Sequence, residues 1–486
     1  MTGNKEIACQ ARTHLRFGHF GVPLHLVTKK EMDNRDLTKG SVLGTMVRFA
    51  LPYMLAYFLQ ILYGLADLFV IGRYCGVEST TAVSNGAQVM YLFTVIIIGL
   101  AMGSTVSIAR SVGASDRRQA ARTIGNTMTL FALLAVVMAV LLVLNISSIV
   151  RLIDTPADAV AGTKDYLFVC FIGIPFIIAY NVLASIFRGL GDSRSPMYFV
   201  AIACGVNIVL DFLFIGHLGM GPRGAALATT LSQMASVVFA LSAIHRHRNI
   251  MDLHRRDLRL HRNTVMAILK TGIPVAMQDG FIQVSFIAIT IIANGRGVCD
   301  AAAVGIVEKF IGLVFIVPSS MLQVVSAMSA QNIGAGLYDR ARQTLSLAVR
   351  ITFSYGMAAA VLMQFIPGHA VSIFTSDPQV IHHGGQYLQA YAWDCALAGI
   401  HFCFSGYFTA CGYSFISFCH NFASIILARI PLSFLLSRSY PDTLYPMGLA
   451  SPLGSLLSIA VCIIVYWQMR KHHFLEKPAN TGTSTI

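Results

Sequence analysis

The amino-acid sequence predicts an all-α membrane protein with twelve transmembrane helices, arranged as two parallel six-helix repeats around a central cavity. Three observations support this fold class: the composition, the recurrence of long apolar stretches, and a duplication of the first half in the second. Apolar residues make up 55% of the 486 residues and charged residues only 12%, whereas about a quarter of a soluble globular chain is charged. With a mean hydropathy of +0.66, the composition excludes an ordinary soluble protein.

Apolar stretches long enough to cross a bilayer cover nearly all of the chain after residue 45. Each reaches about the 20 residues that a spanning helix needs, and none shows the alternation over ~10 residues that is typical of a membrane β-strand. The spans are therefore expected to be helices, which satisfy their own backbone hydrogen bonds inside the bilayer. The twelve expected spans are Met46–Ile71, Thr81–Ile108, Ile124–Ile146, Tyr166–Phe187, Pro196–His217, Gly224–Ile244, Val265–Ile292, Ala301–Met328, Ala341–Ile366, Gly385–Ala410, Ser414–Leu436 and Met447–Met469.

The basic residues predict the orientation of these spans. A net charge of +13 could indicate nucleic-acid binding, but the Lys and Arg residues concentrate in every second loop. The loop after the second span holds Arg110, Arg117, Arg118 and Arg122, whereas the loop after the first holds only Arg73. Because cytoplasmic loops of membrane proteins are enriched in Lys and Arg, we expect cytoplasmic termini, a multi-pass protein of the cytoplasmic (inner) membrane, and no nucleic-acid partner.

The cysteines and the N-terminus carry no pattern of processing or metal binding. Cys395, Cys403, Cys411 and Cys419 recur every eight residues, which is not a zinc-ligand spacing, so we interpret the cysteines as small packing residues and expect no metal site. Residues 1–31 lack the apolar region of a signal peptide. They are expected to be a solvated tail, or an extension from an upstream start codon ahead of Met32.

The second half of the sequence repeats the first at an offset of 221 or 222 residues. Chance similarity between apolar helices would not keep Gly, Pro and Tyr in register, so this is an internal repeat. Since each copy holds six spans, an even number, both copies enter the membrane in the same direction. The matched pairs are Pro52 and Pro274, Gly113–Ala114 and Gly334–Ala335, Tyr166 and Tyr387, and Gly191 and Gly412.

The repeat divides the chain into two lobes joined by a linker that is rich in Arg and His. Its histidines could bind a metal, but a solvated basic segment along anionic headgroups is the simpler interpretation. These histidines are His245, His247, His254 and His261. The predicted parts are an N-terminal tail (1–40), an N-lobe with helices 1–6 (41–245), a cytoplasmic linker (246–264), a C-lobe with helices 7–12 (265–470) and a C-terminal tail (471–486).

Polar residues within the spans are the candidate functional residues, because a charge inside a bilayer is costly unless it faces a cavity or a partner. Asp67 lies in the first span, and Asn207 and Asp211 lie four residues apart on one face of the fifth. The sixth span begins with small residues up to Thr229, which allow a close helix approach. Carboxylate, amide and hydroxyl oxygens suit a proton or Na⁺ better than a soft metal ion.

Other polar side chains are expected to line the central cavity. In the tenth span Asp394, Ala398, His401 and Ser405 form a stripe along one helical face, which is either a cavity wall or a polar seam between helices. Glu308 and Lys309 are neighbours in the eighth span, and either could reach Arg429 or Asp394 on another helix. The cavity candidates are Gln60, Tyr63, Gln88, Asp279, Gln283, Glu308, Asp394 and His401.

The acidic residues do not follow the repeat. Under the offsets above, Asp67 corresponds to Ile289 and Asp211 to Leu432, while Asp279 corresponds to Tyr57 in the first half. Each lobe is therefore expected to carry its own acidic set on a shared scaffold.

From Asp36 onward, the sequence resembles the multidrug and toxic compound extrusion (MATE) transporters. The segments that carry the resemblance are Gln60-Ile-Leu-Tyr63-Gly-Leu-Ala-Asp67, Phe187-Arg-Gly-Leu-Gly191-Asp192, Asn207-Ile-Val-Leu-Asp211 and Asn332-Ile-Gly-Ala335. The resemblance implies a two-lobed antiporter, coupled to H⁺ or Na⁺, that alternates between outward-open and inward-open forms. It also implies an ion site at Asp67, Asn207, Asp211 and Thr229.

The chain departs from the family pattern at two positions. Phe212 follows Asp211 where family members often have Pro, which leaves the bending of that helix open. Gln283 stands where some members have Glu, with Asp279 one turn earlier, so a second ion site in the C-lobe is not carried over.

We therefore expect a monomeric antiporter that exports small organic cations by alternating access, with Asp67 and Asp211 sharing the coupling ion and no other cofactor. A lipid-linked saccharide flippase of the same superfamily is the alternative, although its anionic cargo calls for a basic cavity and the buried charge here is mainly acidic. An enzyme is not expected, because no catalytic or phosphate-binding motif stands in a usable context.

Overall fold

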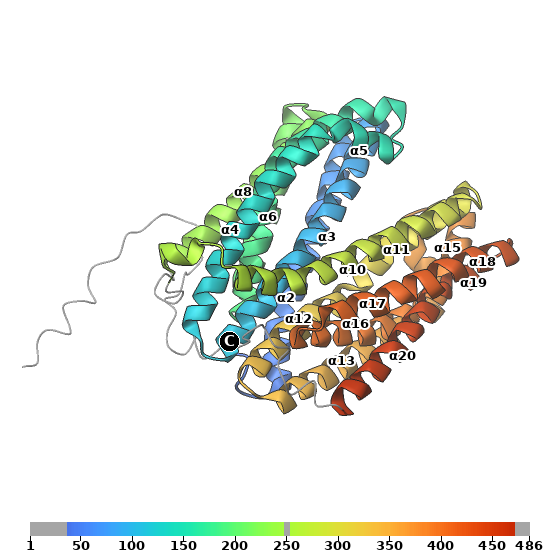
Figure 1. The fold of residues 1–486 in the computed structure, drawn as a ribbon. Coiled ribbons are helices and arrows are strands. Elements are labelled where there is room, and N and C mark those ends of the chain that lie inside the picture. The colour runs from blue at the N-terminus through green and yellow to red at the C-terminus, as the bar shows by residue number, and fades with distance from the viewer. Residues whose placement is uncertain (1–35, 247–252, 472–486) are drawn as a thin grey trace, which may run out of the picture. The chain divides into compact units, whose positions relative to one another are not determined.

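The computed structural model describes residues 36–246 and 253–471, and the chain from Leu37 onward forms one unit. Most of both predicted tails, and linker residues 247–252 with His247, lie outside the described residues. The described chain is almost entirely helical (Figure 1).

The first half contains the helices of the predicted N-lobe. They are α2 (Val42–Tyr74), α3 (Val77–Gly113), α4 (Arg117–Leu144), α5 (Ile146–Leu152), η1 (Ala157–Ala159), α6 (Val160–Gly189), α7 (Arg194–Asp211), the π-helical segment η2 (Phe212–His217) and α8 (Gly221–Arg246).

The second half begins with the 3₁₀ turn of the linker and continues with the helices of the C-lobe. They are η3 (Arg255–Leu258), α10 (Arg262–Asn294), α11 (Val298–Val314), α12 (Ile316–Gly334), α13 (Tyr338–Phe365), α14 (Pro367–Ser372), α15 (Pro378–Tyr391), α16 (Asp394–Cys411), α17 (Ser414–Ser424), the π-helical segment η4 (Ile425–Arg429), α18 (Ile430–Ser439), α19 (Tyr445–Gly448) and α20 (Ala450–Lys471).

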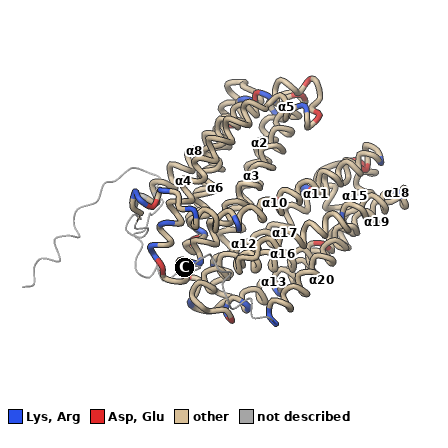
Figure 2. The backbone as a smooth tube through the Cα atoms, viewed as in Figure 1, with Lys and Arg blue, Asp and Glu red and all other residues tan. Residues whose placement is uncertain are grey.

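The predicted spans correspond to these helices. Ten helices of the described residues are long and apolar enough to cross a bilayer, and α11 with α12, which meet at a 43° bend, makes an eleventh. The remaining predicted span, Gly385–Ala410, is divided between α15 and α16 by a short break at Ala392–Trp393. The arrangement agrees with twelve spans in two lobes, two of them interrupted. Figure 2 shows that the middles of the helices carry few charged residues.

The internal repeat is confirmed by the bounds of the helices. The first helix of each half, α2 and α10, has 33 residues, and α4 and α13 each have 28. Gly191 and Gly412, which correspond in the repeat, end equivalent helices with φ of +85° and +87°. Only glycine adopts this left-handed conformation at little cost, which explains its presence in both copies.

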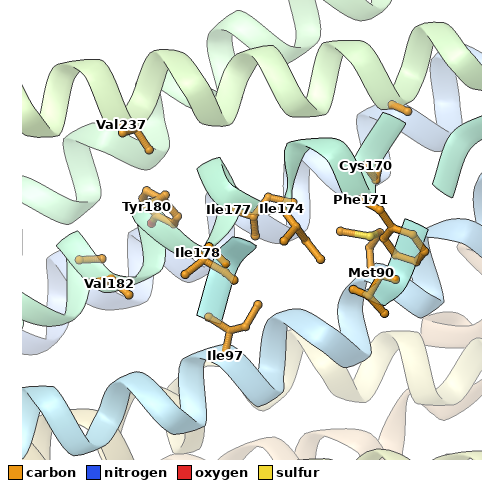
Figure 3. Close-up of a cluster of buried hydrophobic side chains, with 14 of the residues drawn as sticks. Met90, Ile97, Cys170, Phe171, Ile174, Ile177, Ile178, Tyr180, Val182 and Val237 are labelled. Carbon is orange, nitrogen blue, oxygen red and sulfur yellow. The ribbon is translucent and has the colours of Figure 1, made fainter. Parts of the chain in front are cut away.

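The N-lobe core lies where α3, α6 and α8 pack together. Figure 3 shows Met90 and Ile97 of α3 facing apolar residues of α6 such as Phe171, with Val237 contributed by α8. Because lipid tails are as apolar as these side chains, close packing and van der Waals contact hold such helices together. In the C-lobe, α12, α13 and α16 form a comparable core.

The two lobes meet through glycines that allow backbones to touch. A methyl group on Gly113 of α3 would collide with the carbonyl oxygen of Gln331, and one on Gly334 of α12 would collide with that of Arg110. Gly113 corresponds to Gly334 in the repeat, and Arg110 to Gln331, so the contact is reciprocal. Small residues at a helix interface permit this approach.

The predicted packing role of the cysteines agrees with the structure. All nine cysteines of the described residues are free thiols, and six of them are buried.

Candidate functional site

Four polar residues predicted to act together converge inside the N-lobe, and we call them the N-lobe cluster: Asp67, Asn207, Asp211 and Thr229. Asp67 comes from α2, Asn207 and Asp211 from the last turn of α7, and Thr229 from α8. Asn207 and Asp211 are fully buried, and Asp67 is 6% exposed. The hydroxyl of Thr229 donates a hydrogen bond of 3.2 Å to Asp67 Oδ2. The side chains of Asn207 and Asp211 also interact with the Asp67 carboxyl group.

Most polar atoms of the N-lobe cluster have no hydrogen bond of ordinary geometry to another described residue. They are Asp67 Oδ1, both carboxyl oxygens of Asp211, and the oxygen and nitrogen of the Asn207 amide. Leaving such atoms buried and unpaired costs about 1–3 kcal/mol each, and two neighbouring carboxylates cannot both ionise cheaply. A cation bound between them would satisfy both requirements. The donor set, all oxygen, suits a shared proton or Na⁺.

A change of helix type positions Asp211. The α-helix α7 ends at Asp211, and the next six residues, Phe212–His217, are π-helical. The helix geometry therefore changes at this point without the proline that many family members have. Single π-helical turns are rare and often accompany functional sites.

Aromatic and thiol side chains surround Asp67. Tyr63, one of the predicted cavity residues, lies within electrostatic range of Asp67. Tyr166 and Cys170 of α6 also lie within electrostatic range of Asp67. Tyr166 served only as an anchor of the repeat in the sequence, because no spacing links it to α2.

Gln60 lies two turns before Asp67 in α2, at a small cavity of about 20 Å³ within the N-lobe. Its amide nitrogen is 3.5 Å from the hydroxyl of Tyr180, a long hydrogen bond. The guanidinium of Arg188 lies over the ring of Tyr53, 5.4 Å from its centre, at the same cavity.

A second group of charged residues, which we call the C-lobe cluster, consists of Glu308, Asp394, Arg429 and Tyr391. Arg429, in the π-helical segment η4, donates a hydrogen bond of 2.5 Å to the hydroxyl of Tyr391. It also lies within electrostatic range of Glu308 and Asp394, as the sequence suggested for Glu308, and over the ring of Phe286 at 4.8 Å. Lys309 is exposed and takes no part.

The polar stripe of the tenth span forms a seam between helices. Ser455 of α20 donates a hydrogen bond to Asp394 and lies 3.3 Å from Nε2 of His401. The ring of His401 is 5.8 Å from that of His420 on α17, which bonds to Ser458 of α20. Of the two interpretations of this stripe, the geometry favours the helix–helix seam over the cavity wall for His401.

Asp279, on α10, faces the other lobe. Tyr53 and Tyr57 of α2 and Tyr91 of α3 all lie within electrostatic range of its carboxyl group. Tyr57 is the residue that corresponds to Asp279 in the repeat, so equivalent positions of the two halves approach each other here.

Two of the cavity candidates are not joined to these groups. Gln88 is exposed on α3, and Gln283 is half-buried on α10. Neither makes a hydrogen bond to the N-lobe or C-lobe cluster.

Comparisons with known proteins agree with this architecture. The MatE family profile matches residues 52–213 and 274–435, once in each half of the chain. The probable multidrug resistance protein YpnP of Bacillus subtilis is 28% identical over 446 residues, which cover 91% of this chain and 99% of that protein. The FAD transporter of Shewanella oneidensis is 24% identical over 437 residues, 88% of this chain and 95% of that protein.

Solved structures show the same fold. An outward-facing multidrug resistance MATE family transporter of the MOP superfamily superposes with a TM-score of 0.84 at 22% identity, covering 93% of this chain and all of that one. With its profile matched in both repeats, the chain belongs to the multidrug and toxic compound extrusion (MATE) family.

Proposed function

We propose that this multi-pass membrane protein is a cation-coupled antiporter that exports organic cations across the cytoplasmic membrane by alternating access, with both termini in the cytoplasm. The observation that carries the proposal is the N-lobe cluster, in which two buried carboxyl groups face each other without a basic partner among the described residues. The names of relatives such as YpnP support a drug as cargo.

In this proposal H⁺ or Na⁺ enters the N-lobe cluster from outside and binds between Asp67 and Asp211, which lowers their negative charge by one. The weaker negative field no longer holds the organic cation, which is then released. Each inward-moving charge gains about 2.3 kcal/mol per 100 mV of membrane potential, and each H⁺ gains roughly 1.4 kcal/mol per unit of pH difference. In a one-for-one exchange the exported monovalent cation moves against the same potential, so the potential cancels and each unit of pH difference supports an about tenfold concentration gradient.

The group around Asp279 supports an organic cation as cargo. Three tyrosines from the N-lobe lie near this carboxyl group of the C-lobe. Aromatic faces and a carboxylate together bind a desolvated organic cation through cation–π and charge interactions. A substrate at this place would contact both lobes, as alternating access requires.

Two other cargoes are to be tested directly. One is a flavin dinucleotide, because one relative is named an FAD transporter, and the other is a lipid-linked saccharide. Both are anionic, whereas Asp67, Asp211 and Asp279 are acidic. The acidic residues favour the organic cation.

The test is transport in proteoliposomes with an imposed pH or Na⁺ gradient, measured with ethidium, FAD and a labelled lipid-linked saccharide precursor. We expect gradient-driven ethidium transport, which Asp67→Asn and Asp211→Asn reduce to background while Asp165→Asn, an exposed N-lobe residue, leaves it unchanged. Normal transport by both cluster variants would refute the coupling role, and transport of FAD or the saccharide alone would refute the cargo.

A further inference from the structure

A group of three possible metal ligands lies in the C-lobe, on the same two helices as Glu308 and Tyr391 of the C-lobe cluster but eight residues, or about 12 Å, away along each. Cys299 and Asp300 are in the first turn of α11, and His383 is on α15, which packs beside α11 (Figure 1). One donor atom from each residue, Sγ, a carboxylate oxygen and an imidazole nitrogen, lies within 4.8 Å of the other two. The group follows the end of α10, a helix about 50 Å long, and so lies at the opposite end of the lobe from the linker.

The three side chains are positioned for an ion from solution. Nδ1 of His383 is 2.5 Å from Asp300 Oδ1, and the His383 side chain is 29% exposed, whereas the Asp300 side chain is only 8% exposed. Cys299 is half-buried. An ion could therefore reach two ligands from outside and be anchored by a third within the protein.

Arg296 fixes the orientation of the Asp300 carboxylate. Its Nε donates to Asp300 Oδ2 at 2.6 Å, which leaves Oδ1 directed toward His383. The remaining guanidinium nitrogens donate to four backbone carbonyls, that of Ser437 in the last turn of α18 and those of Tyr440, Pro441 and Thr443 in the loop to α19. Metal ligands are commonly oriented by such outer partners, and losing one typically weakens metal binding 10- to 100-fold.

The types of ligand select the ion. A thiolate and an imidazole disfavour Ca²⁺ and Mg²⁺, while thiolate, imidazole and carboxylate together are typical of Zn²⁺. Around a tetrahedral Zn²⁺ the donor atoms are ~3.5 Å apart, so rotations that move the donors by about 1 Å would complete the site. Asp377, within electrostatic range of Cys299, adds negative charge nearby.

We propose that Cys299, Asp300 and His383 bind Zn²⁺, with water as the fourth ligand, and that the ion joins α11 to α15. The site is not part of the repeated scaffold, since the corresponding residues of the first half are Glu78, Ser79 and Gly162. In the absence of the metal, Asp300 forms an ion pair with Arg296 and a hydrogen bond with His383. Binding replaces the proton on His383 Nδ1 and the proton on the Cys299 thiol.

The test uses the purified full-length protein in detergent, stripped of metal with a chelator and titrated with ZnCl₂ against a fluorescent zinc indicator. We expect one Zn²⁺ per chain, with affinity at least about tenfold weaker in Cys299→Ser and in His383→Asn. His382→Asn, the exposed neighbour, and Cys419→Ser, an exposed cysteine elsewhere, are the matched controls. They should bind as the wild type does.

A second measurement identifies the ligands without relying on transport. Cd²⁺ should produce an ultraviolet sulfur-to-metal charge-transfer band in the wild type and in Cys419→Ser, and no band in Cys299→Ser. Zn²⁺ should raise the thermal unfolding temperature of the wild type but not of His383→Asn. Zinc affinities that are equal in the wild type and both ligand variants, or absence of the cadmium band, would overturn the proposal, whatever the outcome of the transport assays.

Discussion

In the N-lobe, Asp67 and Asp211 face each other with no basic side chain of the described residues between them, whereas in the C-lobe Glu308 and Asp394 lie within electrostatic range of Arg429. The two sets lie mostly on different helices of the repeat, α2, α7 and α8 in the N-lobe and α11, α15, α16 and η4 in the C-lobe. The difference is in how the negative charge is balanced: the C-lobe contains a fixed cation, and the N-lobe cluster contains none among the described residues. A fixed cation makes the C-lobe cluster part of the structure, while the N-lobe cluster requires an ion that comes and goes.

The largest loss of stability is expected when the fixed cation of the C-lobe, Arg429, is removed. Arg429→Met removes the cation that balances Glu308 and Asp394 and its hydrogen bond to the Tyr391 hydroxyl, and losing a hydrogen bond to a charged group costs about 1.5–3 kcal/mol. Thermal unfolding in detergent should show this loss, and adding Glu308→Gln and Asp394→Asn should restore much of it. Lys309→Met, an exposed neighbour of Glu308, is the control. Unchanged stability of Arg429→Met would end the distinction between the lobes.

A smaller loss of stability is expected when the glycines at the lobe interface, where the two halves are alike, are replaced by alanine. Gly113→Ala and Gly334→Ala each force a methyl group against a backbone carbonyl, and overpacking of this kind costs about 1–3 kcal/mol. Both substitutions should lower the unfolding temperature to a similar extent. Gly312→Ala, on a helix with open space around it, should not, and a large difference between the two interface variants would contradict the reciprocal contact.

Thr229→Val tests the one hydrogen bond within the N-lobe cluster. Losing it should cost about 0.5–1.5 kcal/mol, observed as a roughly two- to tenfold weaker apparent affinity for the coupling ion. Thr230→Val is a close control, because the adjacent Thr230 hydroxyl is buried without a hydrogen-bond partner among the described residues. Equal ion affinities of the two variants would show that the bond to Asp67 is not used.

The smallest change in stability is expected for Asp211→Asn, the variant that should abolish transport. Asp211→Asn removes one of two facing carboxyl groups, so the free energy of unfolding should stay within about 0.5 kcal/mol of the wild type or rise. The measurement is thermal unfolding of the same preparation used for transport. A destabilisation as large as that of Arg429→Met would mean that the N-lobe cluster is structural as well.

The N-lobe cluster could be predicted from sequence because each of its helices carries a local signal. Asn207 and Asp211 share a helical face through a spacing of four, and Asp67 ends a motif that the family resemblance identifies. The spans could be predicted because a bilayer demands long apolar helices. These features depend on neighbours along the chain.

Features that depend on tertiary packing could not be predicted in this way. Cys299 and His383 are 84 residues apart, a separation that matches no ligand spacing, so no pattern along the chain indicated a metal site. The partner of His401 is Ser455 on α20, which decides between seam and cavity only once the helices are packed. The bend between α11 and α12 near Phe315 and the break before α16 likewise lie within apolar stretches that read as continuous.

The reciprocal contact of Gly113 with Gln331 and of Gly334 with Arg110 has the form of an isologous dimer interface, in which each partner presents the same surface to the other. The chain thus resembles a homodimer of six-helix subunits fused head to tail, whose interface has outlasted the divergence of its buried charges. Such halves should assemble without a covalent connection between them. Two polypeptides split within residues 247–252 should associate in the membrane when they are produced together.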